Sequence, residues 1–183
     1  MNHYIFKNED SISPDGFSEL EELLVPLFSF SYHFMESYRK TGQLYYGSRP
    51  KWRLFLRDED KLIGSLAIVE RKLTKPFPLK IGGIGALGIK GSHQNQGFGG
   101  MILTKAHELM KREGFDVSML FCLEKLKGFY LKCGYRLVNN PVVFTEDGEI
   151  ATEPLALAFP INKDKIGFEE VLGANLNIGE GSW

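Results

Sequence analysis

A glycine run with a polar lead-in is the segment of this sequence best suited to chemistry. Gln94-Asn95-Gln96-Gly97-Phe98-Gly99-Gly100 lies between an apolar stretch that ends near Ile89 and a helical pattern that runs to Arg112. Glycines let the backbone approach an anion closely and adopt a positive φ. A helix N-terminus adds unpaired N–H groups with a partial positive charge. The backbone of this loop can therefore hold a pyrophosphate without a Lys or Arg.

Spacing separates this loop from two other phosphate-binding loops. A P-loop requires Gly, four residues, Gly, Lys and then Ser or Thr, and the sequence has no such run. A dinucleotide loop places GxGxxG directly after a strand, whereas these glycines read GxGG and follow a polar stretch. On the loop alone, a glycine-rich helix start that binds no ligand remains an alternative.

Charge and composition restrict the class of partner. The 183 residues include 22 basic and 23 acidic side chains, a net charge of -1, so no basic field for nucleic acid is present. Met1–Asp10 does not resemble a signal peptide, and no apolar stretch approaches the roughly 20 residues of a spanning helix. We therefore expect a cytoplasmic protein without a membrane partner. Cys122 and Cys133 lack CxxC or zinc-ligand spacing, so reduced thiols and no metal are expected.

The first half of the chain predicts helix followed by a β-hairpin. Phe17–Tyr38 holds apolar residues at helical spacing, and Pro26 should end or kink a helix there, giving two short helices or one bent one. Trp52, Leu54 and Leu56 alternate with Arg53, Phe55 and Arg57. After a polar turn at Asp58–Asp60, an apolar run continues over Leu62–Val69. This pattern is typical of a hairpin.

The second half predicts alternating strands and helices. The expected elements are a loop at Thr74–Leu79, a strand at Ile81–Ile89, a helix from Gly99 to Arg112 stopped by Gly114, a strand at Val117–Phe121, a helix at Leu126–Cys133 and a strand at Tyr135–Val138. Pro141–Pro154 is turn-rich and is expected to be a mobile excursion. This order indicates an α/β (mixed α+β) fold, and the length fits one domain over residues 1–183.

Two motifs together resemble one known superfamily. Gln94-x-x-Gly97-x-Gly99 resembles the Q/R-x-x-G-x-G/A pyrophosphate motif of the GNAT N-acetyltransferases. Downstream, Phe129-Tyr130 followed by Cys133-Gly134-Tyr135 is similar to the helix-and-strand signature of the same superfamily. The two motifs cover about residues 81–138 with the expected spacing. The resemblance implies a central twisted mixed sheet that is splayed at a cofactor cleft and flanked by helices.

The resemblance also implies where acetyl-CoA binds. The co-substrate would lie where the strand at Ile81–Ile89 splays from the strand at Val117–Phe121. Backbone groups of Leu87, Gly88 and Ile89 would pair with the pantetheine amides, and the amides from Gln94 to Gly100 would hold the pyrophosphate. Glycines from Gly82 to Gly85 fit a bulged strand that leaves its partner, although close packing against a helix would explain them equally.

Acetyl transfer to an amine requires an acid and a base. Tyr130 matches the superfamily tyrosine whose hydroxyl can protonate the departing CoA thiolate. Without the motif, its position on an apolar helical face would favour a core aromatic residue. A base must accept the amine proton, and a backbone N–H on the splayed strand can stabilise the oxyanion. Direct transfer gives Cys122 and Cys133 no nucleophilic role.

A narrower resemblance concerns the acceptor. Ala67–Leu73 and the final residues Gly179-Glu180-Gly181-Ser182-Trp183 are similar to aminoglycoside 2′-N-acetyltransferases, which end in Gly-Asp-x-Trp. This implies that Glu180 and the terminal carboxylate of Trp183 serve as base or acceptor-site groups. That family carries a glutamate where this sequence has Gly85. The expected acceptor is therefore a primary amine of a small molecule, with an aminoglycoside as one candidate.

Other functions and residues stay open at this stage. Glu70, Glu124 and His93 are further base candidates, but the two Glu side chains are more typical of solvated charges and His93 of an exposed or phosphate-proximal loop residue. One cluster of aromatic residues has two interpretations, as the wall of an acceptor pocket or as core packing. Its members are Phe28, Phe30, Tyr32, Phe34, Tyr38, Tyr45 and Tyr46. The alternatives are a non-catalytic acyl-CoA-binding regulatory module, which Gly85 keeps open, and a protein or peptide N-acetyltransferase. A homodimer is among the states that the resemblance implies.

Overall fold

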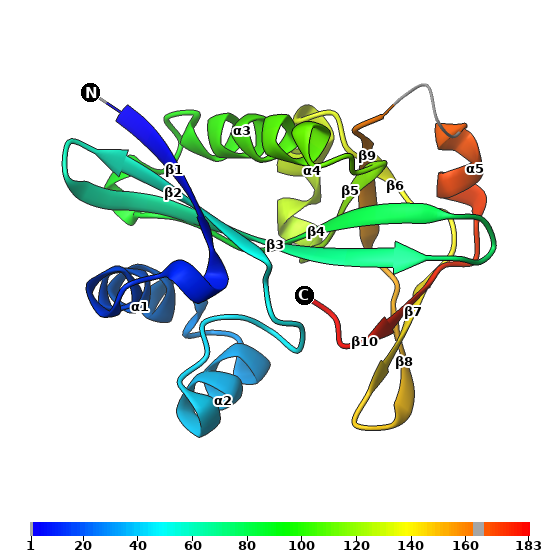
Figure 1. The fold of residues 1–183 in the computed structure, drawn as a ribbon, viewed down its shortest axis with the longest axis horizontal. Helices are drawn as coiled ribbons and strands as arrows, with labels where there is room; N and C mark the ends of the chain where they lie inside the picture. Colours follow the sequence, from blue (N-terminus) through cyan, green and yellow to red (C-terminus); the bar gives the residue numbers. More distant parts are fainter. Residues whose placement is uncertain (1, 163–166) are drawn as a thin grey trace.

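A seven-stranded mixed sheet forms the centre of the computed structural model, which describes residues 2–162 and 167–183 (Figure 1). The strands lie in the order β1-β2-β3-β4-β5-β9-β6. Their bounds are β1 Asn2–Asn8, β2 Trp52–Asp58, β3 Lys61–Leu73, β4 Leu79–Ile89, β5 Val117–Phe121, β6 Arg136–Leu137 and β9 Ala156–Pro160. Neighbours are antiparallel except for β4 and β5, which run parallel.

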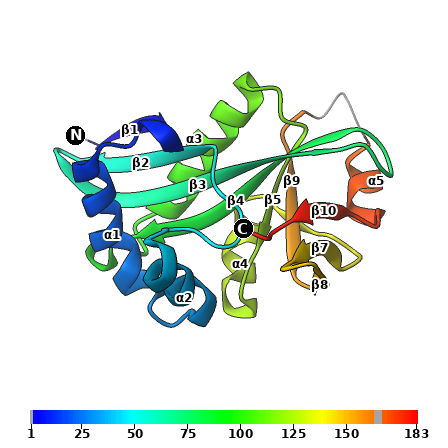
Figure 2. The same ribbon diagram turned by 60° about the horizontal axis from the view of Figure 1, so that its bottom comes forward.

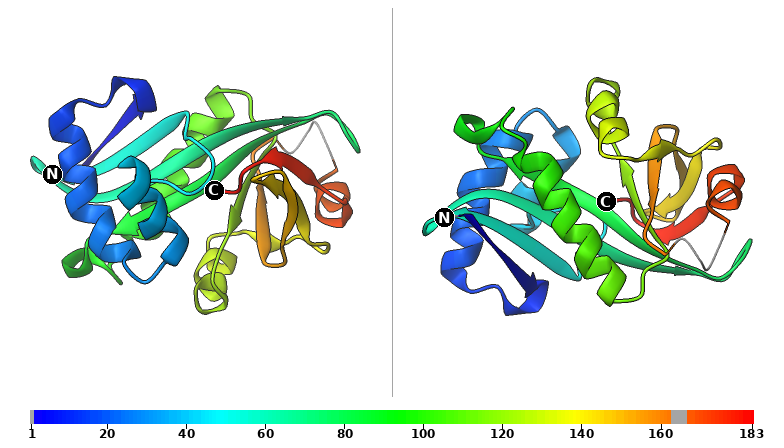
Figure 3. Two further views of the ribbon diagram at one scale, coloured as in Figure 1. Left: turned by 90° about the horizontal axis from the view of Figure 1, so that it is seen from below. Right: turned by 90° about the horizontal axis from the view of Figure 1, so that it is seen from above.

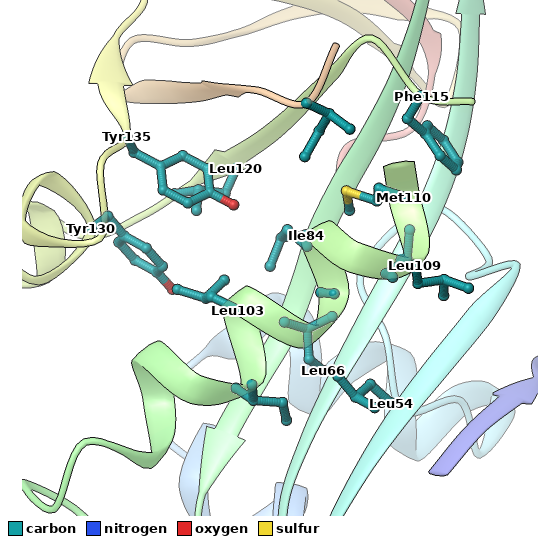
Figure 4. Close-up of a cluster of buried hydrophobic side chains, with 14 of the residues drawn as sticks. Leu54, Leu66, Ile84, Leu103, Leu109, Met110, Phe115, Leu120, Tyr130 and Tyr135 are labelled. Atoms are coloured by element: carbon teal, nitrogen blue, oxygen red, sulfur yellow. The ribbon is translucent and has the colours of Figure 1, made fainter. Parts of the chain in front are cut away.

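Helices cover both faces of the sheet. Their bounds are α1 Pro14–Phe28, α2 Tyr32–Thr41, α3 Phe98–Arg112, α4 Glu124–Lys132 and α5 Phe168–Gly173, with short 3-10 turns at Glu9–Ser11 and Gly91–His93. In Figure 1, α1 and α2 lie on one face and α3 on the other. Successive strand residues point to opposite faces. Leu54 and Leu66 therefore pack with α3 (Figure 4), and Phe55 and Ala67 pack with α1 on the other face.

The β-hairpin, the glycine-rich strand and the elements on either side of the glycine loop agree with the sequence prediction. The helix pair is also confirmed, but the break lies at residues 29–31 because α1 continues through Pro26 and ends at Phe28. Pro26 lies in the last turn of α1, where its missing N–H group removes only one backbone hydrogen bond. The helix therefore continues past it to Phe28. The strand expected at Tyr135–Val138 is present but spans only Arg136–Leu137.

The prediction of a mobile excursion at Pro141–Pro154 was wrong. This segment forms the hairpin of β7 (Val142–Glu146) and β8 (Glu149–Glu153), closed at Asp147-Gly148, where both residues have a positive φ. The strand β10 (Asn177–Glu180) pairs with β7 and completes a second sheet in the order β10-β7-β8. Turn-forming residues at both ends of the segment masked its two short strands in the sequence pattern. The hairpin is ordered because β7 pairs with β10, which is distant in the sequence.

No helix in the described part of the chain is long and apolar enough to cross a membrane.

Candidate cofactor and acceptor site

The parallel strands β4 and β5 separate partway along their length. They pair from Ile81 opposite Val117 to Ile84 opposite Leu120, and β4 then continues to Ile89 while β5 ends. Figure 3 shows the two strands diverging toward α4. A gap in an open sheet exposes backbone groups to a ligand. Leu87, Gly88 and Ile89 therefore lie on a strand segment that no longer pairs with β5, as the resemblance implied.

A β-bulge produces this divergence. The register between β3 and β4 shifts after Ser65, so that Gly88 faces Ser65 and Gly85 faces Ala67. Within the bulge Ala86 has a φ of 45°, which is uncommon for a residue with a Cβ. Bulges bend a strand and increase its twist. The bulge therefore turns the end of β4 away from β5.

The glycine loop joins the end of β4 to α3. Gly97 is the N-terminal cap of α3 with a φ of 86°, and no side chain caps the helix there. The first N–H groups of a helix have no partner inside it. The side chains of Gln94 and Gln96 fold back and donate to the carbonyls of Ile89 and Ser92, each at 2.9 Å. The backbone at the start of α3 is therefore free to hold an anion.

A groove continues from this loop between α3 and α4. It has a volume of about 630 Å³ and begins at Gly97 and Gly100. Met101 and Thr104 of α3 form one wall, and Lys132 lies across from them at the end of α4. An anionic group attached to a pyrophosphate on the loop would find space and a positive charge here.

Tyr130 lies on α4 at the base of the divergence and is 7% exposed. Its ring packs edge to face against Tyr135, with 5.9 Å between the centroids. In Figure 4 the hydroxyl points away from Tyr135 and toward Leu103. Burial raises the pKa of this hydroxyl well above 10, with a smaller contribution from Cys122 and Cys133. The group therefore keeps its proton at neutral pH and is available as a donor.

A buried hydrogen-bond chain lies behind Tyr130. His107 Nε2 lies 2.9 Å from the Tyr135 hydroxyl, which lies 2.7 Å from Ser118 Oγ. The imidazole stacks on Phe159 at 4.1 Å, and its burial lowers the pKa of His107 to about 4. Sequence reasoning missed this group because its members come from α3, β5 and the α4–β6 turn, and no spacing links them.

The chain end lies on the face of β4 opposite α3. Trp183 is 6% exposed, and its indole packs flat on Gly83 and stacks on Phe121 at 4.9 Å. The carboxyl carbon of Trp183 lies 3.4 Å from the position that a Cβ would take on Gly85. Figure 2 shows the C-terminus beside β4 and β5. The structure thus brings Trp183 to the place where the resembled family carries a glutamate side chain.

The predicted acid Glu180 is placed differently. It ends β10 with an exposed side chain, and its carbonyl accepts hydrogen bonds from Arg71 and Ser48. Its backbone therefore anchors the segment that leads to Trp183.

The remaining base candidates interact with other side chains. Burial alone would raise the pKa of Glu70, but the ammonium groups of Lys51 and Lys80 at 3.1 and 3.4 Å outweigh it and lower that pKa. Glu124 is exposed at the start of α4 and pairs with Lys127. His93 lies in the glycine-loop region, where its ring is 5.9 Å from Phe98.

The aromatic cluster divides into core and surface residues. Phe34 is fully buried and packs with Phe28 and Tyr46, whereas Phe30 and Tyr32 are 63% and 69% exposed. Leu24 and Leu27 of α1 lie within 3.0 Å of the position that a Cβ would take on Gly88. The exposed α1–α2 turn therefore lies on the acceptor side of the splayed strand. Among the described residues, no three or more His, Cys, Asp or Glu gather into a possible metal site.

Comparison with known proteins agrees with this architecture. The model of the acetyltransferase (GNAT) family matches residues 17–135, whereas no curated protein matches the chain. The CoA complex of the GNAT family N-acetyltransferase YhbS from Escherichia coli has a TM-score of 0.64 at 14% identity, covering 98% of this chain and 91% of that one. The chain belongs to the acetyltransferase (GNAT) family.

Two further solved structures share the fold. An acetyl-CoA complex of a GNAT family acetyltransferase from Elizabethkingia anophelis has a TM-score of 0.54 at 17% identity, covering 87% of this chain and 97% of that one. An aminoglycoside 6'-N-acetyltransferase complexed with coenzyme A has a TM-score of 0.60 at 14% identity, covering 86% and 97%. At these identities the likeness shows the fold alone, so the acceptor must be argued from the site.

Proposed function

We propose that this chain, as one acetyltransferase domain over residues 1–183, transfers an acetyl group from acetyl-CoA directly to a primary amine of a small molecule. The observation that carries this proposal is the divergence of β4 from β5, with the glycine loop at one end and Tyr130 at its base. The thioester supplies an activated acetyl group. All other steps belong to residues of this chain.

The cofactor-binding residues follow from the backbone. Leu87, Gly88 and Ile89 lie beyond the last residue pair with β5, so backbone groups on the open side of this segment would pair with the pantetheine amides. The amides at Gly97, Gly99 and Gly100 face the pyrophosphate at the start of α3. The loop side chains of Gln94, Asn95, Gln96 and Phe98 shape the same turn, in which Asn95 has a φ of 60°.

The acid role belongs to Tyr130. When the amine nitrogen bonds to the acetyl carbon, the carbon–sulfur bond breaks and the sulfur leaves as a thiolate. The Tyr130 hydroxyl donates its proton to that sulfur and regains one from solvent, whereas the proton that the amine releases goes to the base on the acceptor side.

The base on the acceptor side has two candidates, the Trp183 carboxylate and Glu180. With Trp183 as the last residue, its carboxylate lies beside Gly85 and can accept the amine proton directly or through water. Glu180 is an exposed second candidate three residues earlier in the chain. A chain extended by Gly-Ser after Trp183 would move the carboxylate away, so a fall in kcat with unchanged acetyl-CoA affinity supports Trp183 as the base.

The alternatives make different demands on this site. A non-catalytic acyl-CoA-binding module needs the loop but not Tyr130, whereas both are in place here. A peptide acceptor, an aminoglycoside and a simpler amine are distinguished only by assay, because the likeness to an aminoglycoside enzyme extends to the fold alone. A homodimer and a cytoplasmic location remain part of the proposal.

The test is calorimetric titration with acetyl-CoA, followed by release of CoA thiol with a panel of amines. Gly97→Glu places a negative charge on the pyrophosphate loop and should abolish binding. Gly148→Glu is the matched control, because Gly148 has a φ of 81° against 86° at Gly97 and both positions are open. Failure of the wild type to bind acetyl-CoA, or equal loss in both variants, would contradict the proposed cofactor site.

A further inference from the structure

The segment Glu180–Trp183 is fixed by a close crossing with residues 47 and 48. Ser48 N donates to the Ser182 carbonyl at 2.9 Å, and Gly181 N donates to the Thr145 carbonyl at 2.8 Å. Gly181 has a φ of 72°, and a Cβ there would lie 2.6 Å from Ser48 Oγ. A glycine is therefore required at this crossing, and the path of the last residues has little freedom.

Arg71 on β3 joins the two sides of the crossing. Its Nη2 donates to Ser48 Oγ, to the Glu180 carbonyl at 2.5 Å and to the Gly181 carbonyl at 3.3 Å. Its guanidinium carbon lies 5.9 Å from the Trp183 ring. The two N–H groups of this one nitrogen are shared among the hydroxyl and the two carbonyls, so one end of the guanidinium holds both sides of the crossing together. We call Arg71 and Ser48 the tail clamp.

The tail clamp sets the position of the acceptor-side wall. Because Trp183 packs on Gly83 with its carboxyl carbon beside Gly85, the indole and the backbone occupy the face of β4 that side chains would otherwise cover. Nothing on β4 itself replaces them, since both positions are glycines. The shape of this face therefore depends on where the tail clamp holds the chain.

We infer that Arg71, acting with Ser48, is a positioning residue that fixes Trp183 beside Gly85 and so determines how the amine acceptor is held. This inference rests on the proposed acetyl transfer. Arg71 touches neither the loop nor Tyr130 in the contacts described above. Its loss should therefore change the reaction with the amine and leave acetyl-CoA binding intact.

The experiment measures three quantities in Arg71→Ala, Arg71→Lys and Ser48→Ala. They are the acetyl-CoA Kd, the kcat and KM for the best amine of the panel, and Trp183 fluorescence in a Trp52→Phe background. Lys72→Ala is the control, because Lys72 is the next residue on β3 and its side chain is 72% exposed. For Arg71→Ala we expect kcat/KM for the amine to fall roughly tenfold or more, as misplacement of a site group does.

The other readouts separate positioning from a general effect on folding. The acetyl-CoA Kd should stay unchanged, Trp183 emission should shift to the red as the indole becomes exposed, and Arg71→Lys should restore part of kcat/KM. Ser48→Ala should show the same pattern more weakly, and it decides the question if Arg71→Ala does not fold. Unchanged amine kinetics, or equal loss of acetyl-CoA binding, would overturn the inference. A wild type that binds acetyl-CoA but acetylates no amine would instead overturn the proposed function and this inference with it.

Discussion

At the scale of single residues, Trp183 lies on the face of β4 where Gly85 has no side chain. Gly85 removes the Cβ that a glutamate would use, and the carboxyl carbon of Trp183 comes within 3.4 Å of that position. In the proposed reaction, a carboxylate at residue 183 would take the role of a side chain at residue 85, because proton transfer depends on the position of the accepting oxygen. The departure at Gly85 is therefore compatible with catalysis.

Tyr130→Phe tests the acid at this scale. Removing the hydroxyl should lower kcat by about 100-fold or more, the usual contribution of a positioned acid, while the acetyl-CoA Kd stays unchanged. The ring remains and still packs against Tyr135, so folding should be unaffected. Steady-state release of CoA thiol measures the effect. Tyr4→Phe is the control, because Tyr4 lies on the edge strand β1, three strands away from β4, and an equal kcat in both variants would remove Tyr130 from the mechanism.

His107 predicts how stability depends on pH. Its folded-state pKa of about 4 lies below the value of 6.5 in the unfolded chain, so the unfolded state binds a proton first as the pH falls. Stability from this group is fully present above pH 6.5 and is lost toward pH 4, by about 3 kcal/mol at most. Urea unfolding at several pH values measures the loss.

The control variants for this prediction differ in burial. His107→Gln should flatten the pH dependence in that window, because no imidazole remains to be protonated. His3→Gln should leave it unchanged, since His3 is exposed. Identical slopes in wild type and His107→Gln would show that other groups cause the acid sensitivity.

At the scale of elements, the glycines of β4 allow close packing on both faces. A Cβ on Gly82 would lie 2.6 Å from Met110 of α3, and a Cβ on Gly83 would lie 2.3 Å from the Trp183 indole. The sequence left two explanations for these glycines, a bulge or close packing. Close packing explains Gly82 and Gly83, and the bulge lies further along the strand, at Ala86.

A double-mutant cycle tests the contact between β4 and the chain end. Gly83→Ala should destabilise the protein by about 1–3 kcal/mol, the usual cost of overpacking. In a Trp183→Ala background the added methyl group has space, so the same change should cost much less. Gly128→Ala on α4 meets nothing within 4 Å and should be neutral or slightly stabilising. Additive costs at 83 and 183 would contradict the packing described here.

The predicted elements are those with strong local signals. The alternation in β2, the apolar run of β3, the apolar face of α3 and the glycines around the cofactor loop are all visible in the sequence. The hairpin β7–β8 was not visible in the sequence, because its order depends on pairing with β10. The register of that pairing shifts between Asn177 and Glu180. The same holds for the site. Motifs located the loop and Tyr130, whereas the position of Trp183 depends on contacts between residues 47, 71 and 181, which no spacing reveals.

At the scale of the whole molecule, the sites proposed for the two reactants lie on different faces of the sheet beside the gap between β4 and β5. The pyrophosphate loop begins α3 on one face of the sheet, whereas α1, α2 and Trp183 border the opposite face. Both reactants can therefore be bound at once. Direct transfer in such a complex needs no acyl-enzyme intermediate.

This arrangement predicts the kinetic pattern of the reaction. Double-reciprocal plots of velocity against acetyl-CoA at several amine concentrations should intersect, because both substrates must be present before a product leaves. Cys122→Ala and Cys133→Ala should keep the same pattern and most of kcat, since burial raises the pKa of both thiols and keeps them protonated. Parallel lines, together with an acetylated cysteine detected by mass spectrometry, would instead indicate a covalent intermediate.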